Sequence, residues 1–506
     1  MFLFDGITTA LLAASLVTAH PSTPPSYASP PGYASPQASA YCTSSDLTYK
    51  LSSITAPAQG NGNANGQQVF NLTIDDTSSG YKQTLDGFGA AVTDATVVSF
   101  SQLSSSSLDT LLNTLMTSSG ANFSLMRHTI GASDLSPDPP YTYDENGGMG
   151  KADPGLANFT LTSAGTAMAN LLAKMKGKNG GLTVVGSPWS APSWMKKNRR
   201  LIGDTTNNNL QDRYLNSSET DYSNYFAQYF VKYIQAFANL GVTVNAITLQ
   251  NEPLYSASGY PTMYMYDYEQ GNLIKNFVGP QLSSAGLSTS IWAYDHNTDV
   301  PTYPQTVLNT ASSYTTTVAW HCYAGNVDWS TLTAFRANNT NISGLKQYMT
   351  ECWTPATDST NWFQAANFTI GPLQNWANGV IAWTLAANST NGPHLSTGGC
   401  ANCQGLVRIN DDGSVTFNLA YYLMAQFSRF MPKGAIVLSM KGYSPTSYKA
   451  GLQAVGSLNP DKTRTVVMMN TLTSAVFVRL MTGRGQMWSG SLPKSSVVTW
   501  VLPAVS

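Results

Sequence analysis

The feature that most constrains the fold is an alternation that runs from about residue 83 to about residue 395. Short apolar runs, each ending in polar or aromatic residues, alternate with longer stretches of helical periodicity, and this pattern is typical of a parallel barrel. Eight such runs are present, at 86–90, 125–131, 184–189, 247–252, 291–296, 318–323, 347–351 and 380–384. We therefore predict an α/β fold centred on a (β/α)8 TIM barrel.

Two of the intervening stretches have the clearest helical pattern. Apolar residues recur at helical spacing between Met168 and Met175 and again between Phe226 and Leu240. The second stretch opens with a capping-box pattern at 218–221 and stops at Gly241, so both ends of a helix are predicted there.

The segments on either side of the barrel have a period of two instead. Each is too short to bury its own apolar face, so we expect them to pair into one β-sandwich beside the barrel. We predict N-terminal sandwich strands at 42–82, the catalytic barrel at 83–404 and the C-terminal part of the sandwich at 405–506. Residues 20–41 are rich in Pro, Ser, Ala and Tyr, which indicates a leader or linker.

The first 19 residues indicate export. An apolar stretch from Ile7 to Val17 is followed by small residues, as in a signal peptide, although the usual basic start is missing. No later stretch is apolar for long enough to span a bilayer. We therefore predict a secreted, extracellular glycoprotein. Eight N-x-Ser/Thr sequons agree with this, although a chain so rich in Asn, Ser and Thr would contain several by chance: Asn71, Asn122, Asn158, Asn216, Asn338, Asn341, Asn367 and Asn388.

The composition argues against charged partners. Only 10% of the 506 residues are charged, with 26 basic against 27 acidic side chains, which suits neither nucleic acid nor an anionic bilayer. A surface rich in hydroxyl and amide groups, with 26 Tyr and 11 Trp, suits neutral sugars, because their apolar faces stack on aromatic rings.

The five cysteines leave several alternatives open. Cys400 and Cys403 are close enough in sequence for a small-loop disulfide, although the same spacing also fits half a zinc site or a redox pair. We expect Cys322 and Cys352 to be buried small side chains. The five histidines lack ligand spacing, so no metal or other cofactor is predicted.

Two of the apolar runs end in a glutamate, Glu252 before Pro253 and Glu351 before Cys352. A TIM barrel exposes its chemistry at the carboxyl ends of its strands, and two carboxylates facing one cavity are what glycosidic bond cleavage requires. An isolated Asn-Glu-Pro would also fit a turn or a helix start. Two glutamates at strand ends favour the catalytic interpretation.

The neighbours of the glutamates suit the same chemistry. Asn251 and Glu252 point to opposite faces of a regular strand, so both reach the cavity only if the strand is bent or bulged, and Pro253 favours such a departure. Asn251 would then donate to a sugar hydroxyl. We expect His321 and Tyr323 to orient Glu351 and keep it ionised.

Taken together, these stretches resemble glycoside hydrolase family 30, a retaining family with a (β/α)8 barrel flanked by a β-sandwich. The resemblance covers nearly everything from about residue 65 to 506. It rests on the motifs at 87–94 (GFGAAVTD), 127–136 (RHTIGASDLS), 187–195 (SPWSAPSWM), 249–253 (LQNEP), 349–353 (MTECW) and 383–388 (WTLAAN).

The resemblance implies a role for each candidate site residue. Glu252 would be the acid/base and Glu351 the nucleophile, with Tyr323 bonded to Glu351 and Arg127 holding the nucleophile region. A sugar subsite would be lined by Asp134, Trp189, Asn251 and Trp383. Arg127 would otherwise be a structural ion-pair residue near the barrel floor, and the two tryptophans would be core residues. Weaker candidates for the site are Trp194, Tyr294 and His296.

The family does not fix the substrate, since it includes glucosylceramidases, β-1,6-glucanases, β-1,6-galactanases and xylanases. The stretches at 89–96 and 128–144 look most like those of the fungal endo-β-1,6-glucanases, which implies a neutral β-glucan polysaccharide as partner. We expect a monomer. The alternatives are another specificity of the family or a non-catalytic glucan-binding protein, and the sequence leaves endo and exo action open.

Overall fold

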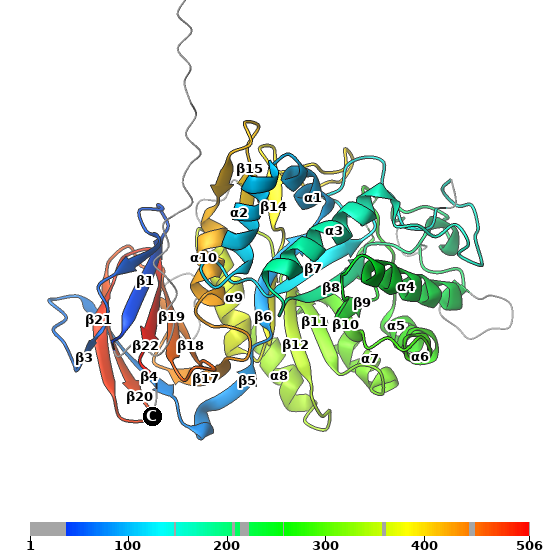
Figure 1. Ribbon diagram of the computed structural model, residues 1–506. Helices are drawn as coiled ribbons and strands as arrows, with labels where there is room; N and C mark the ends of the chain where they lie inside the picture. Colours follow the sequence, from blue (N-terminus) through cyan, green and yellow to red (C-terminus); the bar gives the residue numbers. More distant parts are fainter. Residues whose placement is uncertain are drawn as a thin grey trace, which may run out of the picture.

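The computed structural model describes residues 37–145, 148–204, 208–212, 222–256, 258–356, 361–444 and 451–504. A barrel and a β-sandwich lie side by side (Figure 1). The predicted signal peptide, the leader up to residue 36, the capping box at 218–221 and the sequon at Asn216 lie outside the described residues. Within the described part of the chain, every helix is too short or too polar to cross a membrane.

Eight parallel strands close into the barrel, and each overlaps one of the predicted runs, so the predicted TIM barrel is confirmed. In chain order the strands are β6 (Gly87–Val92), β7 (Leu125–Ile130), β8 (Thr183–Pro188), β9 (Ala246–Thr248), β10 (Ser290–Asn297), β11 (Thr317–His321), β12 (Lys346–Glu351) and β13 (Gly379–Ala382).

Helices connect these strands and cover the outside of the barrel (Figure 1). The two helical patterns of the sequence are confirmed as α3 (Thr162–Lys178) and α4 (Tyr222–Asn239). The other helices of the barrel are α1 (Asp94–Ser101), α2 (Ser105–Met116), α5 (Asp267–Leu273), α6 (Gly279–Ser284), α7 (Thr302–Ala311), α8 (Ser330–Asn338) and α9 (Gln364–Gln374).

The barrel interior is built in two layers. The lower layer is apolar and takes one residue from each of seven strands: Leu125, Val185, Ala246, Trp292, Ala319, Tyr348 and Ile381. Because side chains alternate along a strand, the residues two positions further along also point inward and form the next layer. That layer is polar and contains Arg127, Ser187, Thr248, His321 and Thr350, all buried. Apolar side chains therefore close the barrel at its lower end, and buried polar side chains lie just beneath its open end.

The sandwich is assembled from both ends of the chain, as predicted. The sheet order is β2-β1-β22-β19-β18-β17-β4-β20-β21-β3, with β5 also paired to β17. The N-terminal strand β4 therefore lies between the C-terminal strands β17 and β20, and the other N-terminal strands of this order lie at its two ends. These strands are β1 (Ser39–Ser44), β2 (Lys50–Ile54), β3 (Ala58–Gln59), β4 (Gln68–Asp75), β5 (Tyr81–Thr84), β17 (Ile436–Lys441), β18 (Leu452–Leu458), β19 (Arg464–Asn470), β20 (Val476–Thr482), β21 (Met487–Leu492) and β22 (Ser496–Leu502).

The chain between the barrel and β17 differs from expectation. We placed the return of the sandwich at residue 405, but a small sheet and a helix come first: β14 (Ala386–Asn388), β15 (Val407–Ile409), β16 (Val415–Phe417) and α10 (Leu419–Ser428). Nearly all of α10 is buried, because one side packs on β6 and α9 and the other on β1 and β22. A mostly apolar helix suits such a position, and its buried polar residues Gln426 and Ser428 make hydrogen bonds.

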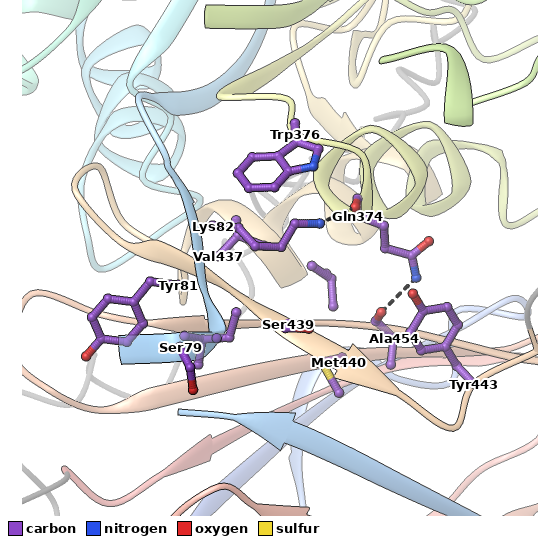
Figure 2. A pocket seen from close by; sticks show the side chains of 13 residues that line it. Ser79, Tyr81, Lys82, Gln374, Trp376, Val437, Ser439, Met440, Tyr443 and Ala454 are labelled. Atoms are coloured by element: carbon purple, nitrogen blue, oxygen red, sulfur yellow. Dashed lines mark hydrogen bonds between the residues drawn. The ribbon is translucent and has the colours of Figure 1, made fainter. Parts of the chain in front are cut away.

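Polar contacts also join the sandwich to the barrel, where β5 meets the end of α9 (Figure 2). Lys82 Nζ donates to the carbonyl of Gln374, and Gln83 Nε2 donates to the carbonyls of Leu373 and Ala377 at 2.8 and 2.9 Å. The carbonyls of Leu373 and Gln374 lie at the end of α9, where they lack intrahelical partners. A cavity of about 310 Å³ lies beside these contacts, and none of the candidate site residues lines it.

Candidate active site

The candidate residues meet at the carboxyl end of the barrel strands. A pocket of about 390 Å³ opens there, and seven of the eight predicted site residues line it: Asp134, Trp189, Asn251, Glu252, Tyr323, Glu351 and Trp383. The eighth, Arg127, lies beneath the pocket in the polar layer and is fully buried. The strands therefore bring the predicted set together.

Glu252 reaches the pocket because the chain leaves the barrel after β9. The strand ends at Thr248, and Glu252 has a left-handed backbone with φ of +47°. The backbone N–H groups of Asn251 and Glu252 donate to the carbonyls of Pro188 and Asp295, at 2.8 and 3.0 Å. The expected departure from strand geometry before Pro253 is therefore observed, and it turns both side chains toward the pocket.

Glu351 ends β12, and both of its carboxylate oxygens accept hydrogen bonds. Arg127 Nη1 lies 2.7 Å from Oε2, and Tyr323 Oη donates to Oε1 at 2.9 Å. A carboxylate oxygen of Glu351 lies within 4.8 Å of one of Glu252. The two glutamates are thus close enough to act on one bond.

Arg127 contacts other residues besides Glu351. Its Nη2 donates to Asn251 Oδ1 at 2.6 Å and to Asp295 Oδ2 at 2.9 Å, and the guanidinium lies 4.9 Å from the ring centroid of Trp189. Arg127 lies one layer above the apolar floor, not on it. It forms the structural ion pair that we considered as an alternative, to Asp295, and the contact to Glu351 as well.

His321 does not hydrogen-bond to Glu351, although its charge favours the ionised form of that carboxylate and lowers its pKa, as expected. Its Nδ1 lies 3.2 Å from Glu252 Oε1 and its Nε2 lies 3.0 Å from Asp295 Oδ1, whereas Tyr323 alone of the two residues bonds to Glu351. His321 is the last residue of β11, which pairs with β10 on one side. Its ring therefore points across the polar layer toward β10 and the chain after β9.

Asp295 was missed because β10 is irregular. Alternation from Trp292 would place Tyr294 inward. In the structure the register shifts at this point, and Tyr294 and Asp295 have φ of +78° and +71°. Tyr294 packs outside the barrel against Tyr303 and Trp320, whereas Asp295 points inward. A bulge of this kind exchanges the faces of adjacent side chains.

The buried charges shift one another's pKa values. Burial alone would raise the pKa of Asp295, but the charges of Arg127 and His321 hold it well below its usual range. Burial disfavours the His321 cation, yet Glu351 and Asp295 raise the pKa of His321 to about 9. Burial favours the neutral form of Glu252, but the hydrogen bond from His321 and the nearby charges of His296, His321 and Arg127 together outweigh it and lower the pKa of Glu252. Burial raises the pKa of Glu351.

Asp134 is half-buried in the pocket wall and faces the same charges. Burial, together with the negative charges of Glu351 and Glu252, raises the pKa of Asp134 to about 8. At acidic and neutral pH the side chain is therefore a carboxylic acid, which can donate as well as accept a hydrogen bond to a sugar.

The aromatic candidates divide into two groups. Trp189 and Trp383 stack with ring centroids 5.2 Å apart and are 2% and 3% exposed, so they are core residues whose edges reach the pocket. The prediction that Trp194 belongs to the site was wrong, because Trp194 is buried away from the pocket and its Nε1–H donates to the carbonyl of Asp144. His296 does line the pocket. Three further aromatic residues line the pocket without having been predicted: Tyr255, Tyr260 and Trp353.

Both cysteine pairs form disulfides. The predicted Cys400–Cys403 bridge is confirmed, and it forms part of the pocket wall. Cys352 is buried as expected and Cys322 is half-buried, but the two also bond to each other where β11 and β12 end, which was not predicted. The zinc alternative for Cys400 and Cys403 does not fit, because a disulfide leaves no thiolate to bind the ion.

Known proteins that resemble this chain agree with the fold. Residues 85–431 match the domain family described as "Glycosyl hydrolase family 30 TIM-barrel domain". Residues 434–500 match the family described as "Glycosyl hydrolase family 30 beta sandwich domain". The boundary between these two matches falls between α10 and β17.

Three relatives are similar over nearly their whole length. An endo-1,6-beta-D-glucanase of Aspergillus fumigatus is 64% identical over 470 residues, which cover 92% of this chain and 95% of the relative. One of Trichoderma harzianum is 60% identical and covers 92% and 94%. The solved structure of an endo-beta1,6-glucanase superposes with a TM-score of 0.77 at 28% identity, and covers 92% of this chain and 99% of that one.

Proposed function

The chain belongs to glycosyl hydrolase family 30, and from this premise we propose that it cleaves β-1,6-glucan by a retaining, double-displacement mechanism. Glu351 is the nucleophile and Glu252 is the acid/base. Arg127, Tyr323 and Asn251 hold these groups, while Asp134, Trp189 and Trp383 bind the sugar.

The observation that carries this proposal is the spacing of the two glutamates. Their nearest carboxylate oxygens lie within 4.8 Å of each other. Retaining glycosidases hold their carboxyl groups about 5 to 5.5 Å apart, whereas inverting ones need roughly 6.5 to 9.5 Å to admit a water molecule between acid and base. The spacing in this pocket suits direct attack on the sugar.

The hydrogen bonds support a division of roles between the two glutamates. Both oxygens of Glu351 accept, from Arg127 and Tyr323, which orients a carboxylate for attack at the anomeric carbon. In the described part of the structure, His321 and His296 both approach Oε1 of Glu252, and no side chain donates to Oε2. Oε2 is therefore available to protonate the leaving oxygen, and later to accept a proton from water.

Asn251 has a matching role. Its Oδ1 accepts from Arg127, so its amide Nδ2 is the group left to donate to a sugar hydroxyl. A hydrogen bond of this kind, strengthened as the oxocarbenium character develops, is worth several kcal/mol to a glycosidase, on the order of a thousandfold in rate.

The pocket lining supports a neutral glucan as substrate. It consists mainly of aromatic, amide and carboxyl side chains, and it contains no Lys or Arg among the described residues. A xylanase that recognises acidic branches would need such a cation. The names of the two fungal relatives favour β-1,6-glucan, and the retention of both glutamates argues against a purely glucan-binding protein.

We also propose that the protein is secreted as a monomer and needs no metal ion. Two disulfides are typical of an oxidising compartment, which supports export. Proton transfer and nucleophilic attack are both supplied by carboxyl groups, so the mechanism has no step that requires a metal.

Hydrolysis of pustulan, a linear β-1,6-glucan, tests the proposal directly. Early products sized by chromatography should be oligosaccharides of several lengths if the enzyme cuts within the chain, as its relatives' names say of them. Release of glucose alone would contradict endo action, and no release of reducing ends would contradict the substrate.

A further inference from the structure

We propose that Asp295 is a positioning residue that couples the two catalytic glutamates through His321 and Arg127. This inference rests on the roles proposed above for Glu252 and Glu351. Asp295 does not line the pocket, and it touches neither carboxylate with its own side chain. It acts through the two cations that lie between it and the glutamates.

The carboxylate of Asp295 is saturated with hydrogen-bond partners. Its Oδ2 accepts from Arg127, Ser187 and Thr248 at 2.9, 2.7 and 2.7 Å. Its Oδ1 accepts from Thr350 at 2.7 Å and lies 3.0 Å from His321 Nε2. Neither oxygen is left for a substrate, and the side chain is fully buried. The group is therefore built to hold its partners in place.

This placement requires two consecutive residues with left-handed backbone conformation in the middle of a strand. Tyr294 and Asp295 both have positive φ, which is unfavourable for residues other than glycine. The Tyr294 N–H, lost from the sheet ladder, donates to Gln270 Oε1 at 2.7 Å. The Asp295 carbonyl accepts from the backbone N–H of Glu252 at 3.0 Å. The bulge thus brings in Asp295 and also fixes the main chain of Glu252.

The result is a continuous chain of charged groups from Glu252 through His321, Asp295 and Arg127 to Glu351. The other titratable groups near the His321 ring are those of His296 and Tyr323. The Glu351 and Asp295 carboxylates together favour His321 protonated on both nitrogens, and Asp295 alone of the two hydrogen-bonds to its Nε2, so that Nδ1–H donates to Glu252. A cation beside Glu252 favours its ionised form, which helps it to release its proton to the leaving oxygen.

Asp295→Asn should reveal this coupling in the pH profile. The variant keeps the shape but removes one of the two negative charges that favour the His321 cation, so the pKa of His321 falls and Glu252 loses its neighbouring cation at a lower pH. Glu252 then stays protonated to higher pH. On pustulan we expect kcat to fall by about 10²-fold with a smaller change in KM, and the alkaline limb to move upward by about one pH unit.

Two comparisons separate positioning from stability. Asp76→Asn removes a buried ion pair with Arg464 in the sandwich, so it should lower stability without moving the alkaline limb. On a His321→Gln background, Asp295→Asn should produce no further shift of the limb, because the effect passes through His321. A folded Asp295→Asn protein with reduced kcat and an unmoved limb would overturn the proposal.

A measurement on the unaltered protein needs no active variant. In spectra of ¹⁵N-histidine-labelled protein, the His321 signal, assigned by its loss in His321→Gln, should remain that of the doubly protonated ring above pH 8. Titration of His321 at or below pH 7 would overturn the proposal even if Asp295→Asn failed to fold. If the wild type does not cleave pustulan, the proposed function fails, while this titration still tests the coupling.

Discussion

Arg127 Nη1 lies 2.7 Å from Oε2 of Glu351, and neither side chain is more than 8% exposed. Asp295 binds the other end of the same guanidinium, so Arg127 is held from both sides. A buried ion pair is costly to desolvate and contributes little to stability unless it is well hydrogen-bonded. Its presence directly under the pocket is better explained by the need to hold Glu351 in one orientation.

Glu351→Gln should abolish turnover and leave the fold intact. The amide keeps the shape and most of the hydrogen bonds but is no nucleophile, so we expect kcat on pustulan to fall by about 10³-fold or more. The circular dichroism spectrum and melting temperature should stay close to those of the wild type. Azide should restore no activity to Glu351→Gln, but should do so in Glu351→Ala, which has room for it. Near-normal activity of purified Glu351→Gln would refute the assignment.

The anomeric configuration of the first product should be retained. Direct attack by Glu351 inverts the anomeric carbon once, and attack by water inverts it again. Proton NMR of the products in the first minutes, before mutarotation, should therefore show the β-anomer. An initial α-anomer would require a single displacement and would exclude the two-step mechanism.

Asp134→Asn should change how stability depends on pH. The pKa of Asp134 rises from its ordinary value of 3.8 to about 8 in the folded protein. Between these values the folded protein holds a proton that the unfolded chain lacks, so the stability contributed by this group falls as the pH rises. Asparagine does not titrate. The stability of Asp134→Asn relative to the wild type should therefore increase from pH 4 to pH 8.

Urea unfolding at several pH values in this range checks this expectation. The Gln102→Ala variant, at an exposed position with no titrating group, serves as the control, and its difference from the wild type should stay flat. A constant difference between Asp134→Asn and the wild type across the range would contradict the shifted pKa.

Features that follow regular periodicity or a family motif could be predicted from the sequence. These features include all eight barrel strands and the seven pocket residues. What the sequence did not predict depends on irregular backbone: alternation along β10 favours Tyr294 over Asp295, and only the bulge reverses them. The Cys322–Cys352 bridge depends on two strand ends becoming neighbours, and α10 depends on burial from two sides. None of these follows from a local pattern.

The contact between sandwich and barrel should contribute measurably to stability. Gln83 satisfies two buried carbonyls near the end of α9, so Gln83→Ala should lower the free energy of unfolding by about 1 to 3 kcal/mol. Gln102→Ala, at an exposed position, should change it by less than about 0.5 kcal/mol. Denaturant unfolding measures both.

A truncated chain ending at Lys433 tests the same contact more severely. It retains α10 but leaves exposed the face of that helix that packs on β22, so we expect it not to fold. A protein ending there that melts like the full chain would show that the barrel is independent of the sandwich.

The substrate preference is the prediction that experiment can most easily refute. We expect β-1,6-linked glucan to be cleaved much faster than β-1,3-glucan, xylan or a β-1,6-galactan. A 1,6-bond has one more rotatable link than other glycosidic bonds, so discrimination depends on holding both neighbouring rings in one orientation. The structure removes Trp194 from the residues suited to this and adds Trp353, beside Trp189 and Trp383.

A β-1,6-galactan is the sharpest comparison, since it keeps the linkage and changes the orientation of one hydroxyl group. A site that bonds to that hydroxyl leaves buried polar groups unpaired when the epimer binds, which can reject it by a large factor. Rates on pustulan, laminarin, xylan and the galactan, measured side by side, decide the question. If the galactan or xylan is cleaved faster than pustulan, the roles of Glu252 and Glu351 stand, but the glucanase proposal does not.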